Sequence, residues 1–189
     1  LQANTTGTHN VAVGKGALDT NSTGGYNTVV GSVAMDANTS GLHNSAIGYA
    51  ALTANTTGRD NSAVGMSVMI ANTTGSYNVA LGSYALDANT TGDYNTAIGQ
   101  AALGANTTAD GNTAVGYIAL QDVTTGAYNI AIGYYAGKDI TTAEKNVAIG
   151  DNALRTSTTS GYNIAVGSNA LYANTGGHAN VAVGHKAME

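Results

Sequence analysis

The chain has 189 residues, only 9% of them charged, and its formal net charge at neutral pH is −5. Nucleic acids and anionic membranes attract clustered Lys and Arg, so this composition argues against both as partners. The sequence also contains no apolar run near the roughly 20 residues of a membrane span, and we expect no insertion into a membrane. There is no Cys, so disulfides are excluded.

A pentapeptide, Asn-x-Ala-x-Gly, divides the chain into eleven units of 17 residues. The pentapeptide recurs without insertion or deletion, and it begins at Asn10, Asn27, Asn44, Asn61, Asn78, Asn95, Asn112, Asn129, Asn146, Asn163 and Asn180. One extra residue would turn every later side chain to the opposite face, so the strict period indicates stacked coils. Helical repeats need about 33 to 47 residues. We therefore predict an all-β, parallel β-solenoid of eleven coils and one domain, residues 1–189.

Each coil is numbered here from position 1 at residue 1, and its first feature is a pair of Thr columns at positions 5 and 6. One interpretation is that Thr serves as a strand and turn residue with a hydroxyl to satisfy. The other is a flat array that organises water, as on an ice-binding solenoid, with Thr73, Thr90 and Thr107 facing the ice. Because adjacent strand residues point to opposite faces, only one column can face outward, which favours the first interpretation. The Asn at position 4 also creates glycosylation sequons, as at Asn55 and Asn72.

Position 9 holds a column of aromatic rings. Its tyrosines are Tyr26, Tyr77, Tyr94, Tyr128 and Tyr162, and His9 and His43 share the column. A Tyr ring offers an apolar face and a hydroxyl, which suit a sugar ring or a partner protein. Tyr is also an ordinary strand residue that stacks from coil to coil. The column is therefore either a recognition surface or a packing feature, and packing is the simpler interpretation.

The strand of each coil is predicted at positions 10 to 14. The Asn column at position 10 forms either a ladder of stacked amides or a series of turn caps, and both roles are structural. The Gly column at position 14 marks a tight corner with positive φ. Position 12 is Ala in all coils but one, and position 13 is always apolar. We expect both faces to be buried, one inside the coil and the other against a neighbouring chain.

Motifs that carry chemistry are absent from the sequence. The four His, at His9, His43, His178 and His185, lack the spacing of metal ligands. No calcium-binding nonapeptide, phosphate loop or nucleophile elbow occurs. Acidic residues such as Asp19, Asp36 and Asp87 share position 2 as solvated corners. We expect no enzyme activity, no metal and no cofactor.

The core Asn-x-Ala-Ile/Val-Gly resembles the head repeats of trimeric autotransporter adhesins. The longer run from Asp93 to Leu103, with its Tyr-Asn-Thr-Ala-Ile-Gly and Ala-Leu, is similar to repeats of bacteriophage tail fibres. This resemblance covers the whole chain, although the adhesin unit is shorter, at about 14 residues. It implies a left-handed roll, a homotrimer, and an extracellular, cell-surface or virion location.

Three functions follow as hypotheses. By resemblance, the chain is a rigid adhesin or fibre that attaches to a host glycan or cell surface. Because the sequence starts and ends within a coil without a polar cap, a filament of axially stacked copies is the second hypothesis. Ice binding, resting on the Thr columns alone, is the third.

Overall fold

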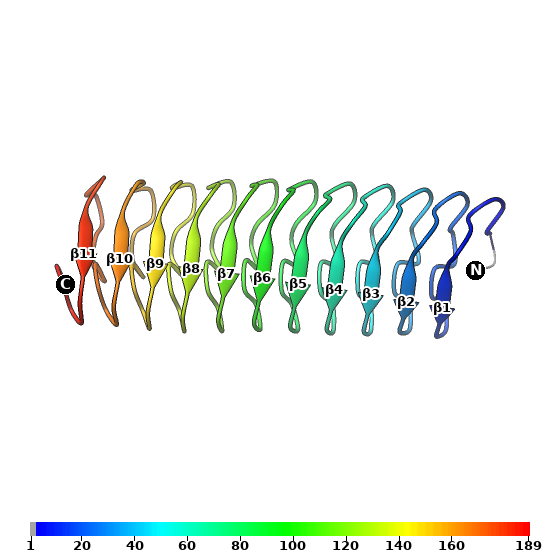
Figure 1. Ribbon diagram of the computed structural model, residues 1–189, viewed down its shortest axis with the longest axis horizontal. Helices are drawn as coiled ribbons and strands as arrows, with labels where there is room; N and C mark the ends of the chain where they lie inside the picture. The colour runs from blue at the N-terminus through cyan, green and yellow to red at the C-terminus, as the bar shows by residue number, and fades with distance from the viewer. Residues whose placement is uncertain (1–2) are drawn as a thin grey trace.

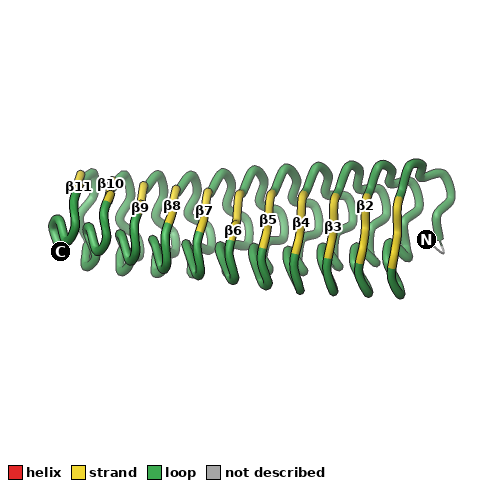
Figure 2. Tube along the Cα trace, turned by 60° about the horizontal axis from the view of Figure 1, so that its bottom comes forward, coloured by secondary structure: helices red, strands yellow, loops and turns green. Residues whose placement is uncertain are grey.

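The computed structural model describes residues 3–189, and within that range it contains eleven three-residue strands and no helix. Figure 1 shows them side by side along one rod, with the two chain ends at opposite ends. The strands are β1 Val11–Val13, β2 Thr28–Val30, β3 Ser45–Ile47, β4 Ser62–Val64, β5 Val79–Leu81, β6 Thr96–Ile98, β7 Thr113–Val115, β8 Ile130–Ile132, β9 Val147–Ile149, β10 Ile164–Val166 and β11 Val181–Val183. Each is flanked by turns that complete the coil (Figure 2).

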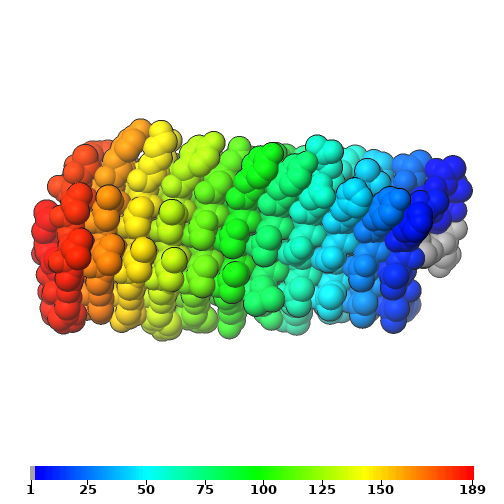
Figure 3. All heavy atoms as spheres, viewed as in Figure 1, coloured from blue at the N-terminus to red at the C-terminus, as the bar shows by residue number. Residues whose placement is uncertain are grey.

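The strands form one parallel sheet in chain order, β1 to β11. Each residue pairs with the residue 17 positions later, as Ala80 does with Ala97 and Leu81 with Ile98. The predicted fold, a parallel β-solenoid with a 17-residue coil, is confirmed. The space-filling view shows coils packed against each other along the whole rod (Figure 3).

Backbone hydrogen bonds also join the coils outside the strands. The Thr73 N–H donates to the Thr90 carbonyl at 2.9 Å, and the Met69 N–H donates to the Ala85 carbonyl at 3.1 Å. Tyr77 donates in the opposite direction, to the Arg59 carbonyl at 3.0 Å. Such a ladder requires nearly every N–H, which explains why the chain contains no Pro.

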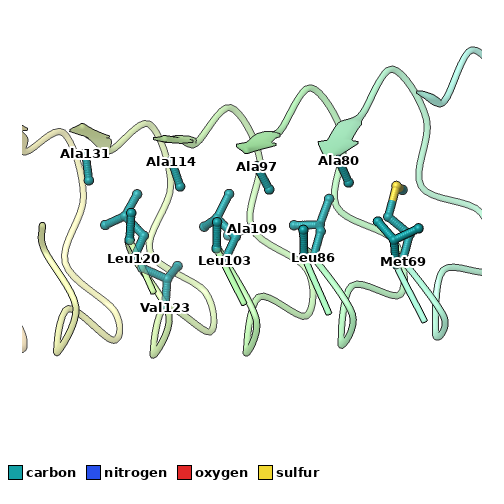
Figure 4. Packing of buried hydrophobic residues seen from close by; sticks show 14 of the residues in the cluster. Met69, Ala80, Leu86, Ala97, Leu103, Ala109, Ala114, Leu120, Val123 and Ala131 are labelled. Atoms are coloured by element: carbon teal, nitrogen blue, oxygen red, sulfur yellow. The ribbon is translucent and has the colours of Figure 1, made fainter. Parts of the chain in front are cut away.

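A thin apolar core runs through the rod (Figure 4). The side chain at position 12, which is Ala in every strand except β2, points inward, and Leu or Met at position 1 faces it from the opposite wall, as Ala97 faces Leu103. Ala at position 17 is buried beside the position 1 column. Because Ala occupies one wall, the space between the walls suits side chains of Leu or Met size. This limited depth accounts for the absence of Phe and Trp.

Three positions of each coil adopt a left-handed backbone, which bends the chain around its corners. In the coil around β5 they are Met69, Tyr77 and Tyr84, with φ of 49°, 60° and 59°. The Gly at position 14 also has positive φ, as at Gly82 (φ 130°), and this prediction from sequence is confirmed. Non-Gly residues in this region cost roughly 1–2 kcal/mol each. Position 1 residues such as Met69 are fully buried, so core packing offsets that cost.

One coil departs from the pattern and restores its own packing. Gly137 replaces Leu at position 1, and Ile140 replaces Asn at position 4. A Cβ at Gly137 would lie 2.9 Å from Cδ2 of Leu120 and 3.1 Å from Cδ1 of Ile140. Ile140 therefore fills the space that the missing side chain leaves.

This exchange predicts strong coupling between the two positions. Gly137→Leu alone overpacks the core and costs about 1–3 kcal/mol, whereas Ile140→Ala alone leaves a cavity and costs about 2–5 kcal/mol. The double variant Gly137→Leu with Ile140→Ala should cost less than the sum of the two single costs, because the Leu fills the space that Ile140 leaves and Leu adopts φ near 55° at this position elsewhere. Urea unfolding of the four proteins measures the coupling. Additive costs would contradict this account.

Position 13 belongs to the outer face of the strand, and its burial against a neighbouring chain stays a prediction. Val30 is 37% exposed, Leu81 49% and Val183 70%. Since successive strand residues alternate and Ala at position 12 points inward, positions 11 and 13 both point to solvent. The apolar outer face is therefore uncovered in the single chain.

Candidate functional site

The Asn column at position 10 is an internal ladder. Asn27 to Asn163 are almost fully buried at each position 10. At the centre of the rod, the Asn95 N–H donates to Oδ1 of Asn78 at 2.8 Å, and Nδ2 of Asn78 donates to the Gly92 carbonyl at 2.9 Å. Both contacts of Asn78 reach the next coil, so the amide acts as a rung between coils, as the ladder interpretation predicts. The amides make these contacts inside the rod, away from any external ligand.

A second Asn ladder, at position 4, was not predicted as such from the sequence. Nδ2 of Asn89 donates to Oδ1 of Asn72 at 2.8 Å and to the Gly92 carbonyl at 3.1 Å. The ladder ends where Val123 replaces Asn, and this leaves the buried Oδ1 of Asn106 without a partner among residues 3–189. The sequon residues Asn55 and Asn72 are fully buried, so their amides are inaccessible to glycosylation in the folded chain.

The candidate ice-facing column donates its hydroxyls to the backbone. Oγ1 of Thr73 and Thr90 each donate to the carbonyl of the next Thr in the column at 3.0 Å, and Oγ1 of Thr107 donates to Thr124 at 3.2 Å. The neighbouring column at position 6, including Thr74 and Thr91, is the more exposed of the two. This geometry weakens the case for ice binding by Thr73, Thr90 and Thr107.

The aromatic column at position 9 consists of short stacks. The Tyr77 and Tyr94 rings lie 5.0 Å apart and 3° from parallel. The Tyr26 ring lies between His9 and His43, at 4.6 Å and 5.1 Å. These stacks cover ring faces while Tyr26 and Tyr94 remain 55% and 63% exposed.

The remaining two tyrosines of the column have individual environments. Tyr128 is 58% exposed, and its ring lies where a Cβ of Gly111 would meet it at 2.7 Å. Tyr162 is 53% exposed and has the Lys145 ammonium 5.1 Å from its ring centroid. The five tyrosines of this column therefore lie on one side of the rod. They are exposed there singly or in short stacks, and no continuous stack joins them.

An ionic cluster lies in the two coils around Gly137, where the sequence departs from the repeat. Nζ of Lys138 lies 2.8 Å from Oδ1 of Asp139 and 3.0 Å from Oδ2 of Asp122, and the hydrogen bond to Asp139 raises the pKa of Lys138. The Arg155 guanidinium lies 4.9 Å from the centroid of the Tyr135 ring.

A shallow hollow of ≈ 410 Å³ lies beside Asp122 of this cluster. It is lined by Tyr84, Asp87, Ala101, Gly104, Ala105, Gln121 and Asp122. It exists because Gly104 stands where other coils carry a larger side chain.

Asp87, on the wall of this hollow, gives a pH-dependent prediction. Burial raises the pKa of its carboxyl above 3.8, despite the opposing backbone N–H groups of Asp87 and Ala88. Ionised Asp87 therefore destabilises the folded chain at neutral pH, and that penalty disappears as pH falls through the folded-state pKa towards 3.8. We expect Asp87→Asn to unfold at a higher temperature than the original chain at pH 7 and at an equal temperature near pH 3. Thermal unfolding across this range measures the difference, and a gap that widens on acidification would contradict the argument.

The outer side of the sheet is the most extensive candidate surface, and we name it the strand face: positions 11 and 13 of all eleven strands. Position 13 is apolar in every strand, and position 11 is apolar or a hydroxyl residue. Neither position carries a charge in any strand. Strands β8 to β11 have apolar residues at both positions, namely Ile130, Ile132, Val147, Ile149, Ile164, Val166, Val181 and Val183.

Residues 3–189 contain no cluster of three or more His, Asp or Glu that could hold a metal ion, and none of their segments forms a helix suited to crossing a membrane. No protein-family model matches the chain, and neither a curated protein nor a solved structure is significantly similar to it.

Proposed function

We propose that the chain is a rigid segment of an extracellular or virion attachment fibre. The observation that supports it most is the unbroken ladder between coils: ten parallel strand pairings, all in the same 17-residue register. Sheet hydrogen bonds and the amide ladder at position 10 act together along the axis, and the second ladder adds to them from Asn4 to Asn106. Eleven coils spaced at about 4.8 Å make a rod about 50 Å long.

Rigidity suits a part that holds two surfaces at a fixed distance. Each coil contacts only its neighbours, so bending or stretching the rod requires breaking hydrogen bonds of a whole coil. The core is filled by Ala, Leu and Met and the amides bond to one another. These features serve mechanical strength, and none of them prepares a reacting group.

The tyrosines at position 9 are the proposed contact with a host glycan or cell surface. Tyr94 and Tyr128 expose more than half of their surface and stand on opposite sides of Gly111 in the column. Exposed Tyr with its hydroxyl is well suited to the mixed apolar and polar surface of a sugar. In this role the rod positions the rings, and the rings make the contact.

Beads coated with the chain test this function. We expect saturable retention on host cells or on a glycan array, and at least a tenfold loss of retention (about 1.4 kcal/mol) when Tyr77, Tyr94 and Tyr128 become Ala. Tyr49, Tyr117 and Tyr134, exposed at position 15, provide a matched triple Ala control that should retain binding. Retention no better than that of bare beads, or equal loss in both variants, would overturn the attachment role.

A further inference from the structure

The strand face presents apolar side chains to solvent on every strand. Exposed examples are Val64 at 37%, Ile132 at 41% and Leu81 at 49%. Fully burying such a side chain contributes about 1.5–3 kcal/mol, which the single chain realises only in part. Position 6 is also exposed but holds Thr or Ser in all units except one. Exposure alone therefore does not account for an apolar residue at position 13 in all eleven coils.

The size of this surface fits a protein interface. Eleven strands at about 4.8 Å give a length of about 50 Å, and positions 11 to 13 at about 3.3 Å per residue give a width of about 10 Å. The product, about 500 Å² on one copy, amounts to about 1,000 Å² for a pair, the area at which a specific interface begins. Position 15 adds exposed Tyr49, Met66, Tyr117 and Tyr134 to its margin.

The charge pattern favours another copy of this chain over a membrane. Two strand faces brought together bury no charge, because Lys15 and Asp151 lie at the margin, at position 15. An anionic lipid surface would need flanking Lys and Arg, whereas the chain has six in total and a net charge of −5. Flat sheets pack face to face at about 10 Å, with their side chains interdigitated.

We propose that a second copy of this chain packs its strand face against this one, with the closest contact at β8 to β11. At these strands both columns are apolar, whereas Thr or Ser occupies position 11 in β2 to β4, β6 and β7. Ile149 of β9 and Val166 of β10 lie at the centre of the contact, and Ile132 of β8 lies beside them. The inference names the partner of the proposed fibre, and it rests on that function only for its biological setting.

The mass of the chain in solution tests this pairing. We expect light scattering to give two or more chains of 18.7 kDa, and one chain for the variant Ile132→Lys with Val166→Lys. The dissociation constant should rise about a hundredfold or more, the size of effect seen when central contacts are lost. Thr91→Lys with Thr125→Lys is the control, since it adds the same charge on the exposed position 6 and should leave the mass unchanged.

The outcomes separate this pairing from the attachment role. A mass of one chain at all concentrations, or equal dissociation of the control, overturns the pairing. If the Lys variant fails to fold, Ile132→Thr with Val166→Thr keeps the test open, because Thr occurs on this face at β6 and β7. This variant should still weaken association at least tenfold, and unchanged association would overturn the pairing. A chain that associates through the face but leaves beads unattached contradicts the attachment role alone.

Discussion

Gly82→Ala is expected to lower the free energy of unfolding by more than about 3 kcal/mol. Gly82 has φ of 130°, a region that L residues rarely enter. A Cβ there would lie 2.7 Å from both the carbonyl carbon and the oxygen of Gly99 in the next coil. The strain of this backbone conformation and the collision with the Gly99 carbonyl therefore both destabilise the folded variant. The collision could be relieved only by moving the two coils apart.

Substitutions at two other glycines separate the cost of backbone strain from the cost of the collision. Gly184 has a similar φ of 126°, but no described atom lies within 4 Å of its Cβ position, so Gly184→Ala tests strain alone. Gly176 has open space and no positive φ, and Gly176→Ala should be near neutral. Urea unfolding should rank the three costs as Gly82 above Gly184 above Gly176. Equal stability of the Gly82 and Gly176 variants would contradict the close stacking of coils.

Asn78→Val should cost about 3 kcal/mol, whereas Asn106→Val should cost less than about 1 kcal/mol. At Asn78, removal of Oδ1 leaves the buried Asn95 N–H without its acceptor. At Asn106, Oδ1 is already unpartnered among the described residues, and Nδ2 donates to Oδ1 of Asn89 at 3.0 Å. The second substitution therefore moves an unpartnered oxygen to Asn89 without adding one.

The sequence of the chain agrees with this difference between positions 4 and 10. Val123 occupies position 4 in the coil after Asn106, whereas position 10 is Asn in all eleven coils. Chemical denaturation of both variants beside the original chain provides the measurement. If Asn106→Val proved as costly as Asn78→Val, the amide at Asn106 would have to stabilise the coil in some other way.

The sequence was sufficient for the architecture because the repeat is free of insertions. An Asn-x-Ala-x-Gly every 17 residues determines the coil length and the register of pairing, and both agree with the structure. The positive φ of the Gly column at position 14, which includes Gly82, could also be predicted, since such a conformation favours Gly. Left-handed Tyr77 and Met69 were not, because their residue types carry no local signal for that conformation.

The orientation of the strand was harder to predict for a different reason. Alternation separates Ala80 from Val79 and Leu81, but it does not say which set points inward when both are apolar. The outcome depends on the opposite wall, where the Leu or Met of position 1, such as Leu86, leaves room for a small side chain. The pairing of tyrosines into short stacks depends on gaps such as Gly111, whose effect appears only when neighbouring coils are placed together.

Small-angle X-ray scattering of the purified chain shows whether it is a rigid rod of stacked coils. Eleven stacked coils should scatter as a rod of constant length near 50 Å at every concentration. Its cross-section should be that of chains side by side, and it should narrow to one chain in the variant Ile132→Lys with Val166→Lys. Scattering from a compact globular particle would contradict the rod. A length that grows with concentration would contradict side-by-side packing and indicate copies stacked end to end.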